Sequence, residues 1–283
     1  MNYRHAFHAG NFADVLKHAI LIDLLAALLT KPAAFCYVDT HAGRGSYDLH
    51  GEEAERTREY VDGVQRLLGA ANLPPTLDAY VKLVRSFGVD NTGALVRYPG
   101  SPMIAGSLMR ENDRGILCEL HEEEATALRT ALRGASRFAI HQRDGYAALN
   151  ALLPPAQKRG LVLIDPPFES QAGEYVHIQN ALENALARWP NAIYAIWYPI
   201  KLREVIAPFH RWLCKNTGTS DVLVAELLLH PDNSGLRLNG CGVAIVNPPW
   251  QFDRQVREWL RRLTELLTQG RYGACRIDWL KAD

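Results

Sequence analysis

The chain alternates between short apolar runs and longer segments in which apolar residues recur every three or four positions. Short runs bounded by turn residues predict buried strands, and the longer spacing predicts amphipathic helices. A regular alternation of the two predicts a parallel β-sheet with helices on its faces. The expected strands are residues 35–39, 115–120, 138–142, 161–164, 192–198, 222–229 and 242–246, and the expected helices are residues 13–29, 103–112, 122–132, 146–153, 174–188, 200–215 and 254–267.

The last two strands break this rhythm. The loop that joins them, residues 231–240, is rich in turn-forming residues and leaves no room for a helix. Strands joined so closely run antiparallel, so we expect a hairpin at one edge of the sheet. Residues 275–280 could add a further edge strand. The pattern predicts a Rossmann-like α/β fold whose seven-stranded mixed sheet ends in an antiparallel hairpin.

A second break separates the first strand from the second. The first strand leads into a glycine-rich turn at residues 39–45, but the helix expected directly after it begins only near Ser101. Ser101 is a candidate N-cap, and Pro102 suits the first helical position. The residues between carry two amphipathic patterns, at 53–68 and 77–87. We therefore predict a main domain of residues 1–45 and 99–283, interrupted by a helical subdomain at residues 46–98.

Composition and charge narrow the possible functions. The chain has 31 basic and 31 acidic residues, so a nucleic-acid partner would have to bind a local patch. The five cysteines form no CxxC pair and are typical of a reduced, cytosolic protein. The ten histidines include no HExxH sequence, so no metal site is predicted. The first residues do not have the pattern of a signal peptide, and no apolar run has the length of a membrane span.

The strongest candidate for chemistry follows the apolar run 161–164. It is the tetrapeptide Asp165-Pro166-Pro167-Phe168. The prolines end the strand and place Asp165 and Phe168 on a stiff turn at the carboxyl end, where open α/β sheets bind ligands. A carboxylate beside a flat aromatic ring suits a planar base with an exocyclic amine. Taken alone, the tetrapeptide fits equally well with an aspartate that merely caps a turn.

Other strand ends carry acids and glycines. Asp39 precedes a turn in which the backbone at Gly43 can approach a ligand closely. Glu119 ends the second strand, and Asp144-Gly145 follow the third. The first turn lacks the GxGxxG sequence of dinucleotide-binding folds, which argues against a nicotinamide-dependent oxidoreductase.

In this order, these features resemble the class I S-adenosyl-L-methionine-dependent methyltransferases, whose seven-stranded sheet ends in such a hairpin. The tetrapeptide after the fourth strand looks like the motif of enzymes that methylate exocyclic amines of bases. Four stretches resemble a narrower family, the RlmJ family of bacterial 23S ribosomal RNA adenine-N6 methyltransferases. They are residues 3–18, 39–43, 98–102 and 163–167. The resemblance spans the chain, including the insert.

The resemblance implies S-adenosyl-L-methionine as cofactor and 23S ribosomal RNA as partner, in a monomeric cytoplasmic enzyme without metal or membrane. It implies that Asp165 is catalytic and that Tyr3 contacts the RNA. The cofactor contacts that it implies are Lys17, His18, His41, Ser101, Glu119, Asp144 and Gly145.

The residue types support several of these roles. Glu119 can accept both ribose hydroxyls of the cofactor, and Asp144 can accept the amine of its adenine. The helix start at Ser101 offers free N–H groups for the methionine carboxylate. Asp39 and Gly43 are further cofactor candidates from the first turn. Two implied contacts have simple alternatives, because His18 could cap its own helix and His41 could orient the turn.

The chemistry of adenine suggests how the tetrapeptide would act. Asp165 and the carbonyl of Pro166 would hold both amine hydrogens, favour a localised lone pair, and accept a proton after transfer. Phe168 would stack on a base that has left its helix or loop. Many members of that family have tyrosine at this position. Phe168 keeps the stacking surface but lacks the hydroxyl contact that tyrosine could make. The candidates for RNA contacts are Tyr3, Arg4, His5 and Phe168, and also His8, Lys201 and Arg203. Further candidates are Arg254, Arg257, Arg261 and Arg262, although their helix could equally be a solvated cover on the sheet.

A rival copy of the motif is Asn247-Pro248-Pro249-Trp250. If its strand is antiparallel, its end lies at the opposite edge of the sheet, so we predict that it only terminates a strand. Other readings remain open at this stage. They are a guanine-N2 ribosomal RNA methyltransferase, a DNA adenine methyltransferase (which we would expect to have a larger recognition domain), a glutamine methyltransferase and a non-catalytic protein that binds cofactor and RNA.

Overall fold

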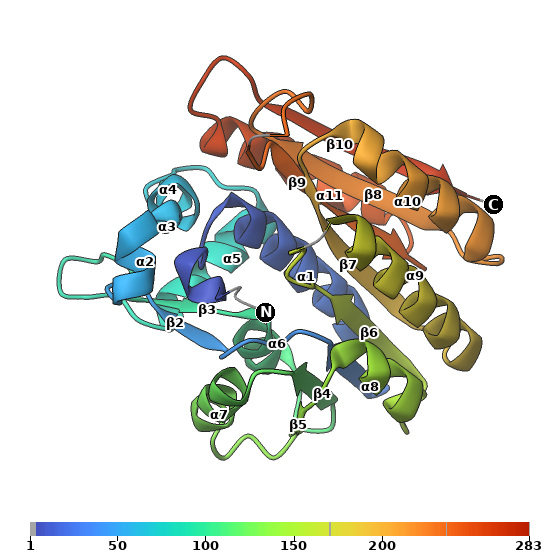
Figure 1. Cartoon of the computed structure of the whole chain (residues 1–283). Coiled ribbons are helices and arrows are strands. Elements are labelled where there is room, and N and C mark those ends of the chain that lie inside the picture. The colour runs from blue at the N-terminus through green and yellow to red at the C-terminus, as the bar shows by residue number, and fades with distance from the viewer. Residues whose placement is uncertain (1–3, 170, 236, 283) are drawn as a thin grey trace.

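A single large sheet runs through the centre of the computed structural model, which describes residues 4–169, 171–235 and 237–282 (Figure 1). The strand order in this eight-stranded sheet is β10-β8-β9-β7-β6-β1-β4-β5. The five strands from β7 to β5 are parallel, whereas β9 is antiparallel to both β7 and β8. The strands are β1 (Phe35–Asp39), β4 (Arg114–Glu119), β5 (Phe138–Gln142), β6 (Arg159–Ile164), β7 (Ile193–Ile200), β8 (Val222–Leu228), β9 (Gly240–Val246) and β10 (Ala274–Lys281).

The predicted fold class is confirmed, with one correction to the sheet. β10 pairs with β8 in antiparallel register, so the sheet has eight strands and the β8–β9 hairpin does not form its edge. The sequence suggested this extra strand, but the count of seven left it out. The reason for the addition is that an unpaired β8 would expose a row of backbone N–H and C=O groups.

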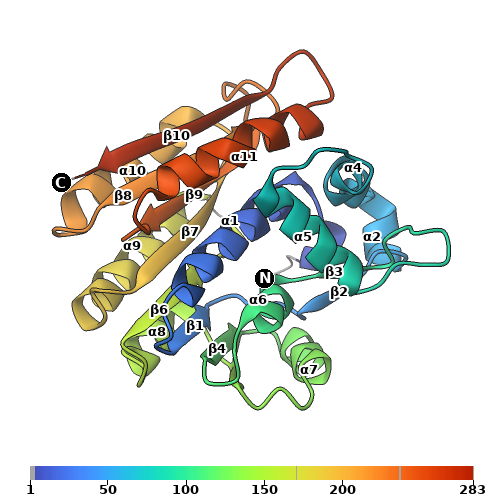
Figure 2. The ribbon, with the colours of Figure 1, turned by 180° about the vertical axis from the view of Figure 1, so that it is seen from behind.

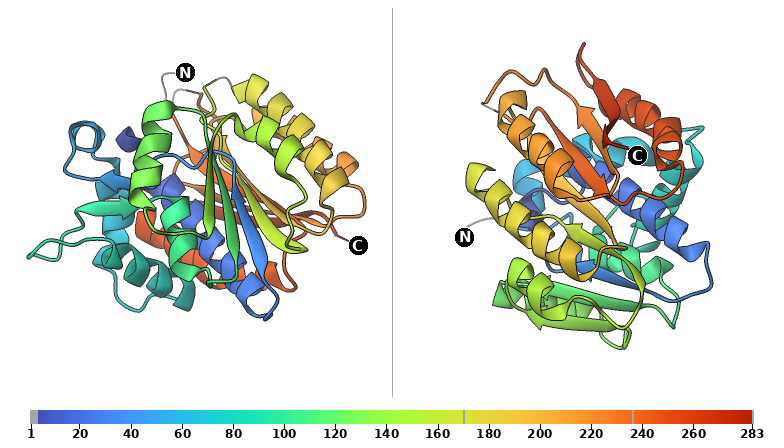
Figure 3. Two further views of the ribbon diagram at one scale, coloured as in Figure 1. Left: turned by 90° about the horizontal axis from the view of Figure 1, so that it is seen from below. Right: turned by 90° about the vertical axis from the view of Figure 1, so that its right-hand side faces the viewer.

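Helices cover both faces of the sheet (Figure 3). Alternate side chains of the central strands enter two different cores. In β6, Leu161 and Leu163 face the core shared with α1 and α11, whereas Val162 and Ile164 face the core shared with α9 and α10. This period of two is what a strand buried on both faces requires. The helices of the main layers are α1 (Phe12–Leu29), α6 (Ser101–Leu108), α7 (Glu122–Ala131), α8 (Gly145–Leu152), α9 (Gln171–Arg188), α10 (Arg203–Asn216) and α11 (Phe252–Leu267).

The segment between β1 and α6 folds over α1 (Figure 2). Its elements are β2 (Ser46–Asp48), α2 (Glu52–Thr57), α3 (Glu59–Asp62), α4 (Val64–Leu68), α5 (Pro75–Ser86) and β3 (Arg97–Pro99). The amphipathic pattern predicted at 53–68 is helical, but it is divided among three short helices, α2, α3 and α4. The break at Gly63 has a steric cause, since a Cβ there would lie 2.1 Å from the Gly10 carbonyl oxygen. The Val64 amide donates to that oxygen at 2.8 Å, which fastens the segment to the N-terminal arm.

This covering segment explains the environment of α1. The sequence predicted an amphipathic helix, but Asp14, Lys17, His18 and Asp23 are all buried, because α5 and α11 pack where solvent would otherwise be. The helix starts at Asn11, whose side-chain oxygen accepts from the amides of Ala13 and Asp14. No helix in the described residues is both long and apolar enough to cross a membrane.

Two predicted helix starts need correction. Gly100, not Ser101, is the N-cap of α6, because the Ser101 hydroxyl donates to Asp39 Oδ2 at 2.7 Å instead. α6 also ends at Leu108 rather than at residue 112. α10 begins at Arg203, later than predicted, because β7 continues through Pro199 to Ile200. The pairing of β7 with β6 ends at Ile196. Beyond this point, Trp197 and Pro199 of β7 line a cavity.

Candidate active site at the carboxyl edge of the sheet

A cavity of about 1040 Å³ opens at the carboxyl ends of β1, β4, β6 and β7. The short 3₁₀ helix η1 (His5–Phe7) and the start of α1 form another part of its wall. Tyr3 lies outside the described residues, and Asp39 does not line the cavity. The remaining predicted site residues do line it: Arg4, His5, Lys17, His18, His41, Gly43, Ser101, Glu119, Asp144, Gly145, Asp165, Pro166 and Phe168.

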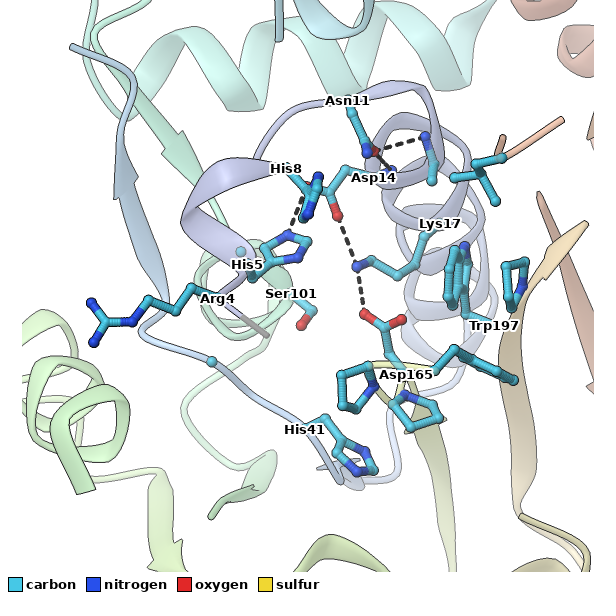
Figure 4. A pocket seen from close by; sticks show the side chains of 18 of the residues that line it. Arg4, His5, His8, Asn11, Asp14, Lys17, His41, Ser101, Asp165 and Trp197 are labelled. Carbon is cyan, nitrogen blue, oxygen red and sulfur yellow. Dashed lines mark hydrogen bonds and ion pairs between the residues drawn. The ribbon is translucent and has the colours of Figure 1, made fainter. Parts of the chain in front are cut away.

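Asp165 stands where β6 ends and is held by a lysine from α1 (Figure 4). Lys17 Nζ lies 2.5 Å from Asp165 Oδ2 and 2.8 Å from Asp14 Oδ1. Among the described residues, no donor contacts the second oxygen of Asp165. One carboxylate oxygen is thus fixed by the protein, and the other remains an acceptor for a ligand in the cavity.

The charge of Lys17 is secured by its two partners. Burial alone would lower the pKa of this ammonium group, but Asp14 and Asp165 raise it well above its usual value. Burial likewise would raise the pKa of Asp14, yet the facing His5 and Lys17 bring it well below its usual value. Asp14, Lys17 and Asp165 therefore form a row of ion pairs in the wall of the cavity.

Phe168 completes the turn in an unusual backbone conformation, with a φ of 32°. Positive φ is rare for a bulky residue, and such conformations cluster at functional sites. The ring is held edge-on by Tyr175 at 5.3 Å and Trp197 at 5.6 Å between centroids. These contacts fix the orientation of the ring beside Asp165.

The N-terminal arm packs against the same assembly. His5 Nε2 lies 2.9 Å from Asp14 Oδ2, and because a carboxylate only accepts, the ring must donate from Nε2. Arg4 lies 3.8 Å from Glu53 and 3.7 Å from Glu123. The cation of Arg4 therefore already faces two carboxylates, and His5 is tied to the floor of the cavity.

Glu119 is oriented by backbone amides at the end of β4. Its Oε2 accepts from Gly43 N at 2.9 Å, and its Oε1 accepts from His121 N at 2.8 Å. The close approach at Gly43 uses a φ of 61°, and a Cβ there would lie 2.3 Å from the Tyr47 hydroxyl. Each carboxylate oxygen still has lone pairs, so Glu119 can accept two further donors from a ligand.

Asp39 lies beneath the first turn and shapes it. It is fully buried, and its carboxylate accepts from the hydroxyls of Tyr37 and Ser101, each at 2.7 Å. Burial raises the pKa of Asp39 to about 6, partly offset by those two hydrogen bonds. The side chain therefore connects β1 to α6 rather than facing the cavity.

Asp144 and Gly145 form the turn between β5 and α8. Asp144 is the N-cap of α8, and its Oδ1 accepts from Ala147 N at 2.8 Å. Gly145 is required sterically, because a Cβ would lie 2.0 Å from the Thr40 carbonyl oxygen. Asp144 thereby sits at the cavity wall with one oxygen committed to the helix.

The two histidines with simple alternatives, His18 and His41, both adjoin the cavity. His18 Nδ1 lies 2.7 Å from the Tyr98 hydroxyl, whereas Nε2 is buried without a partner among the described residues. Burial lowers the pKa of His18 to about 3 and that of His41 to about 4, so both rings are neutral. Thr40 Oγ1 lies 2.8 Å from His41 Nδ1, which supports an orienting role.

Several residues were missed by the sequence analysis. Asp14 was not singled out, although its position three residues before Lys17 predicts an ion pair on one helix face. Trp197 had no sequence signal beyond its place near the end of a predicted strand. Tyr98, the partner of His18, lies in a resembling stretch but was not assigned a role. Among the described residues, no group of three or more His, Cys, Asp or Glu side chains is arranged to hold a metal ion.

The rival turn lies elsewhere, as predicted. The end of β9 pairs with the start of β7, at Val246 and Tyr194. Asn247 Nδ2 donates to the carbonyl oxygens of Pro190 and Ala192 at 2.7 and 2.8 Å. The Asn247 turn is therefore at the amino edge of the parallel strands and is not part of the cavity.

The basic RNA candidates are separated by the structure. Lys201 is exposed and lines the cavity. Arg203 is instead bound to Glu226 and Asp232 at 2.7 Å each. The arginines of α11 lie on a helix that contributes no residue to the cavity wall.

Comparisons with known proteins agree with one another. A family model described as "Ribosomal RNA large subunit methyltransferase D, RlmJ" matches residues 32–281. Proteins named ribosomal RNA large subunit methyltransferase J are 39% identical in Escherichia coli K12 and 37% identical in Haemophilus influenzae, each over 99% of both chains. A crystal structure of a Legionella pneumophila protein aligns with a TM-score of 0.87 and 35% identity, over 96% of this chain and 98% of that one. The chain therefore belongs to the ribosomal RNA large subunit methyltransferase J family.

Proposed function

We propose that the chain transfers a methyl group from S-adenosyl-L-methionine to the N6 amine of an adenine in 23S ribosomal RNA. The observation that carries this proposal is the ligand-facing oxygen of Asp165, held beside a fixed aromatic ring at the carboxyl edge of the sheet. The names of the two bacterial relatives support large-subunit ribosomal RNA as the substrate. We further propose that the enzyme acts in the cytoplasm as a monomer.

The cavity has the size and donors that the cofactor needs. Ligand cavities usually measure about 300–1000 Å³, so a cavity of about 1040 Å³ leaves room for a nucleoside cofactor and a flipped base together. Glu119 would accept from the ribose, Asp144 from the adenine amine, and the start of α6 at Ser101 would receive the carboxylate. The unpartnered His18 Nε2 is a further polar atom in the cavity wall. Asp39 and Gly43 would act by shaping the turn.

When bound, the cofactor supplies a methyl group on a positively charged sulfur. The protein then has to hold and orient the amine, whose lone pair is delocalised into the adenine ring. Asp165 Oδ1 and the carbonyl oxygen of Pro166 would accept the two amine hydrogens and favour a localised lone pair. Positioning and preorganised electrostatics of this kind can lower a barrier by several kcal/mol. A carboxylate is too weak a base to deprotonate a neutral amine, so Asp165 would accept the proton after the nitrogen has become cationic.

We propose that Lys17 orients Asp165, a role that can stand beside the cofactor contact implied by the resemblance. Its ammonium group fixes Asp165 Oδ2, so Oδ1 is turned toward the base. Phe168 provides a flat surface on which the base stacks, and Trp197 and Tyr175 prevent the ring from turning away. Preorganisation of these groups means that little reorientation is needed when the base arrives.

The experiment uses 23S ribosomal RNA transcribed in vitro and cofactor with a labelled methyl group. After digestion to nucleosides, mass spectrometry identifies the labelled product. Labelled N6-methyladenosine is the expected result. Labelled N2-methylguanosine would assign the same turn to guanine, and unlabelled RNA beside labelled DNA or protein would contradict the RNA substrate.

A further inference from the structure

The described residues of the loop between β8 and β9, 229–235 and 237–239, lie at one side of the cavity mouth. Leu229, His230 and Leu238 from this loop line the cavity together with Lys201 from the turn after β7. The loop is tied to that turn by Asn239, whose side-chain amide donates to the carbonyl oxygens of Lys201 and Ser234 at 2.5 and 2.6 Å. We call Lys201 and this loop the basic edge.

A buried ionic group holds the basic edge in place. Arg203 donates from Nη1 to both oxygens of Glu226, at 2.7 and 2.8 Å, and from Nε to Asp232 Oδ2 at 2.7 Å. Glu226 is fully buried in β8, and the Tyr198 hydroxyl donates to it at 2.8 Å. Arg203 therefore links strand β8 to a loop residue, Asp232.

The loss of hydration makes this ion pair a poor source of stability, so its value lies in fixing one geometry. A buried ion pair contributes little net stability compared with apolar packing, because both charges lose hydration. Its attested use is to specify one geometry. Here, Nη1 donates to Glu226 and Nε donates to Asp232, so contacts from two nitrogens together orient the guanidinium group and set the position of Asp232. The loop is thus preset before any ligand arrives.

The charges presented by the two sides of the cavity mouth differ. On the side of the insert, Arg4 faces Glu53 and Glu123, and His8 lies 3.0 Å from Glu59. On the basic edge, Lys201 and Arg237 are exposed, and within the described part of the chain no carboxylate pairs with either. Anionic ligands are attracted to cations that are not already neutralised.

We propose that the basic edge binds the RNA phosphates that flank the target nucleotide, with Lys201 and Arg237 as the contacts and Arg203 as the positioning residue. This inference rests on the proposed function, since it names the surface that holds the same RNA. Phosphate contacts of this kind fix the position of a nucleic acid without reading its sequence. They would hold the backbone on one side of the cavity while the base enters between Asp165 and Phe168.

The first test measures binding of in-vitro-transcribed 23S ribosomal RNA between 50 and 200 mM KCl. Each phosphate contact to single-stranded RNA contributes about 0.7 to the slope of log affinity against log salt. The double variant Lys201→Ala/Arg237→Ala should weaken binding about tenfold or more and reduce the slope by about 1.4. The matched control is Arg254→Ala/Arg257→Ala, which removes two exposed arginines of α11 and should leave affinity and slope unchanged.

The second test separates positioning from mere stability. Arg276 also faces Glu226, at 3.8 Å, but belongs to β10 and not to the loop. Arg203→Met should raise the KM for RNA about tenfold without changing cofactor affinity, whereas Arg276→Met should leave the KM within about twofold. Should Arg203→Met fail to fold, Asp232→Ala keeps the Glu226 contact and should raise the KM in the same way, while Asp232→Asn keeps an acceptor and should restore it.

The outcomes distinguish this inference from the function on which it rests. Loss of binding in the α11 variant together with normal binding in the Lys201/Arg237 variant would overturn the basic edge and leave methyl transfer standing. Equal KM values for Arg203→Met, Asp232→Ala and Arg276→Met would overturn the positioning role. A wild-type protein that neither binds nor methylates the RNA would overturn the proposed function, and the basic edge with it.

Discussion

The chain contains two turns of nearly the same sequence, Asp165-Pro-Pro-Phe168 and Asn247-Pro-Pro-Trp250, at opposite edges of one sheet. Both follow a buried strand, and both use two prolines to stop it. At the first turn, a lysine holds the acidic side chain and two aromatic rings hold Phe168. At the second, the Asn247 amide caps two backbone carbonyl groups, and Trp250 is 90% exposed.

The difference teaches that strand direction decides what such a turn can do. β6 is parallel to its neighbours, so its carboxyl end meets those of β1 and β4 and shares their ligand edge. β9 runs the other way, so the same sequence pattern is delivered to an edge without the cofactor turn. The two prolines end the strand in both cases, but the residue with positive φ is Phe168 in the first turn and Asn247 in the second. The sheet decides which partners each turn meets.

The largest difference between the two turns is expected from paired alanine substitutions. Asp165→Ala removes the acceptor that aligns the amine, and we expect turnover to fall by about 10³-fold or more. Asn247→Ala should leave turnover within about twofold but lower the free energy of unfolding by about 1–3 kcal/mol, because two carbonyl groups lose their donor. Steady-state methylation assays and urea denaturation measure the two effects. Loss of turnover in a folded Asn247→Ala protein would reverse the assignment of the two turns.

The next largest effect is expected at Lys17, which contacts Asp165 of the first turn. Among the described contacts of the second turn there is no such lysine. Lys17→Met leaves Asp14 and Asp165 without their shared cation, so we expect turnover to fall about a hundredfold and stability by about 3–5 kcal/mol. Lys82→Met is a matched control, since it breaks an exposed pair with Asp78 on the insert and should change stability by less than about 0.5 kcal/mol. If Lys17→Met altered cofactor affinity and left the rate of the bound complex intact, Lys17 would be a cofactor contact instead.

A smaller effect is expected from the aromatic residues. Phe168→Ala removes a stacking surface worth about 1–3 kcal/mol, so affinity for the RNA should weaken about tenfold while cofactor affinity is kept. Trp250→Ala changes a ring that is almost fully exposed and should have no effect on either affinity. Fluorescence or filter-binding titrations with RNA compare the two. Equal losses from both variants would show that the turns contribute alike.

The smallest effect is a dependence of stability on pH at the edge that carries Asp165. Burial lowers the pKa of His18 to about 3, so between pH 6.5 and that value the unfolded chain binds a proton that the folded chain does not. Stability therefore falls as the pH drops below 6.5, by at most about 1.4 kcal/mol per pH unit from this group. His18→Gln should reduce the slope between pH 6.5 and 5 in urea denaturation, leaving the part that comes from His41, whereas Asn247→Ala should lower stability equally at each pH. An unchanged slope in His18→Gln would contradict the neutral buried imidazole.

Much of this arrangement follows from local sequence. The apolar run before Asp165 predicted a buried strand, and the glycines and acids at residues 39–45, 119 and 144–145 predicted a ligand edge. These predictions depend on the period of side chains along a strand and on where prolines and glycines stop it, and both are local properties. The resemblance in four stretches then added the roles of individual residues.

What could not be predicted depends on contacts between distant residues. Asp14 pairs with His5 and Lys17, and through Lys17 it reaches Asp165, far along the chain. The hydroxyl of Ser101 binds Asp39 and so leaves the cap of α6 to Gly100. The amphipathic pattern at 53–68 is interrupted at Gly63, where the close approach of the Gly10 carbonyl group leaves no room for a Cβ. Each of these outcomes is set by a partner that periodicity and capping rules do not reveal.

The central claim is that Asp165 aligns the substrate amine and does not hold the cofactor. The most direct test measures, for wild type and Asp165→Ala, the cofactor dissociation constant by calorimetry and the rate of a single turnover with cofactor and RNA both saturating. The account predicts a cofactor affinity within about threefold of wild type and a single-turnover rate reduced by about 10³-fold or more. A variant that loses cofactor binding, or one that transfers the methyl group at the wild-type rate once saturated, would contradict it.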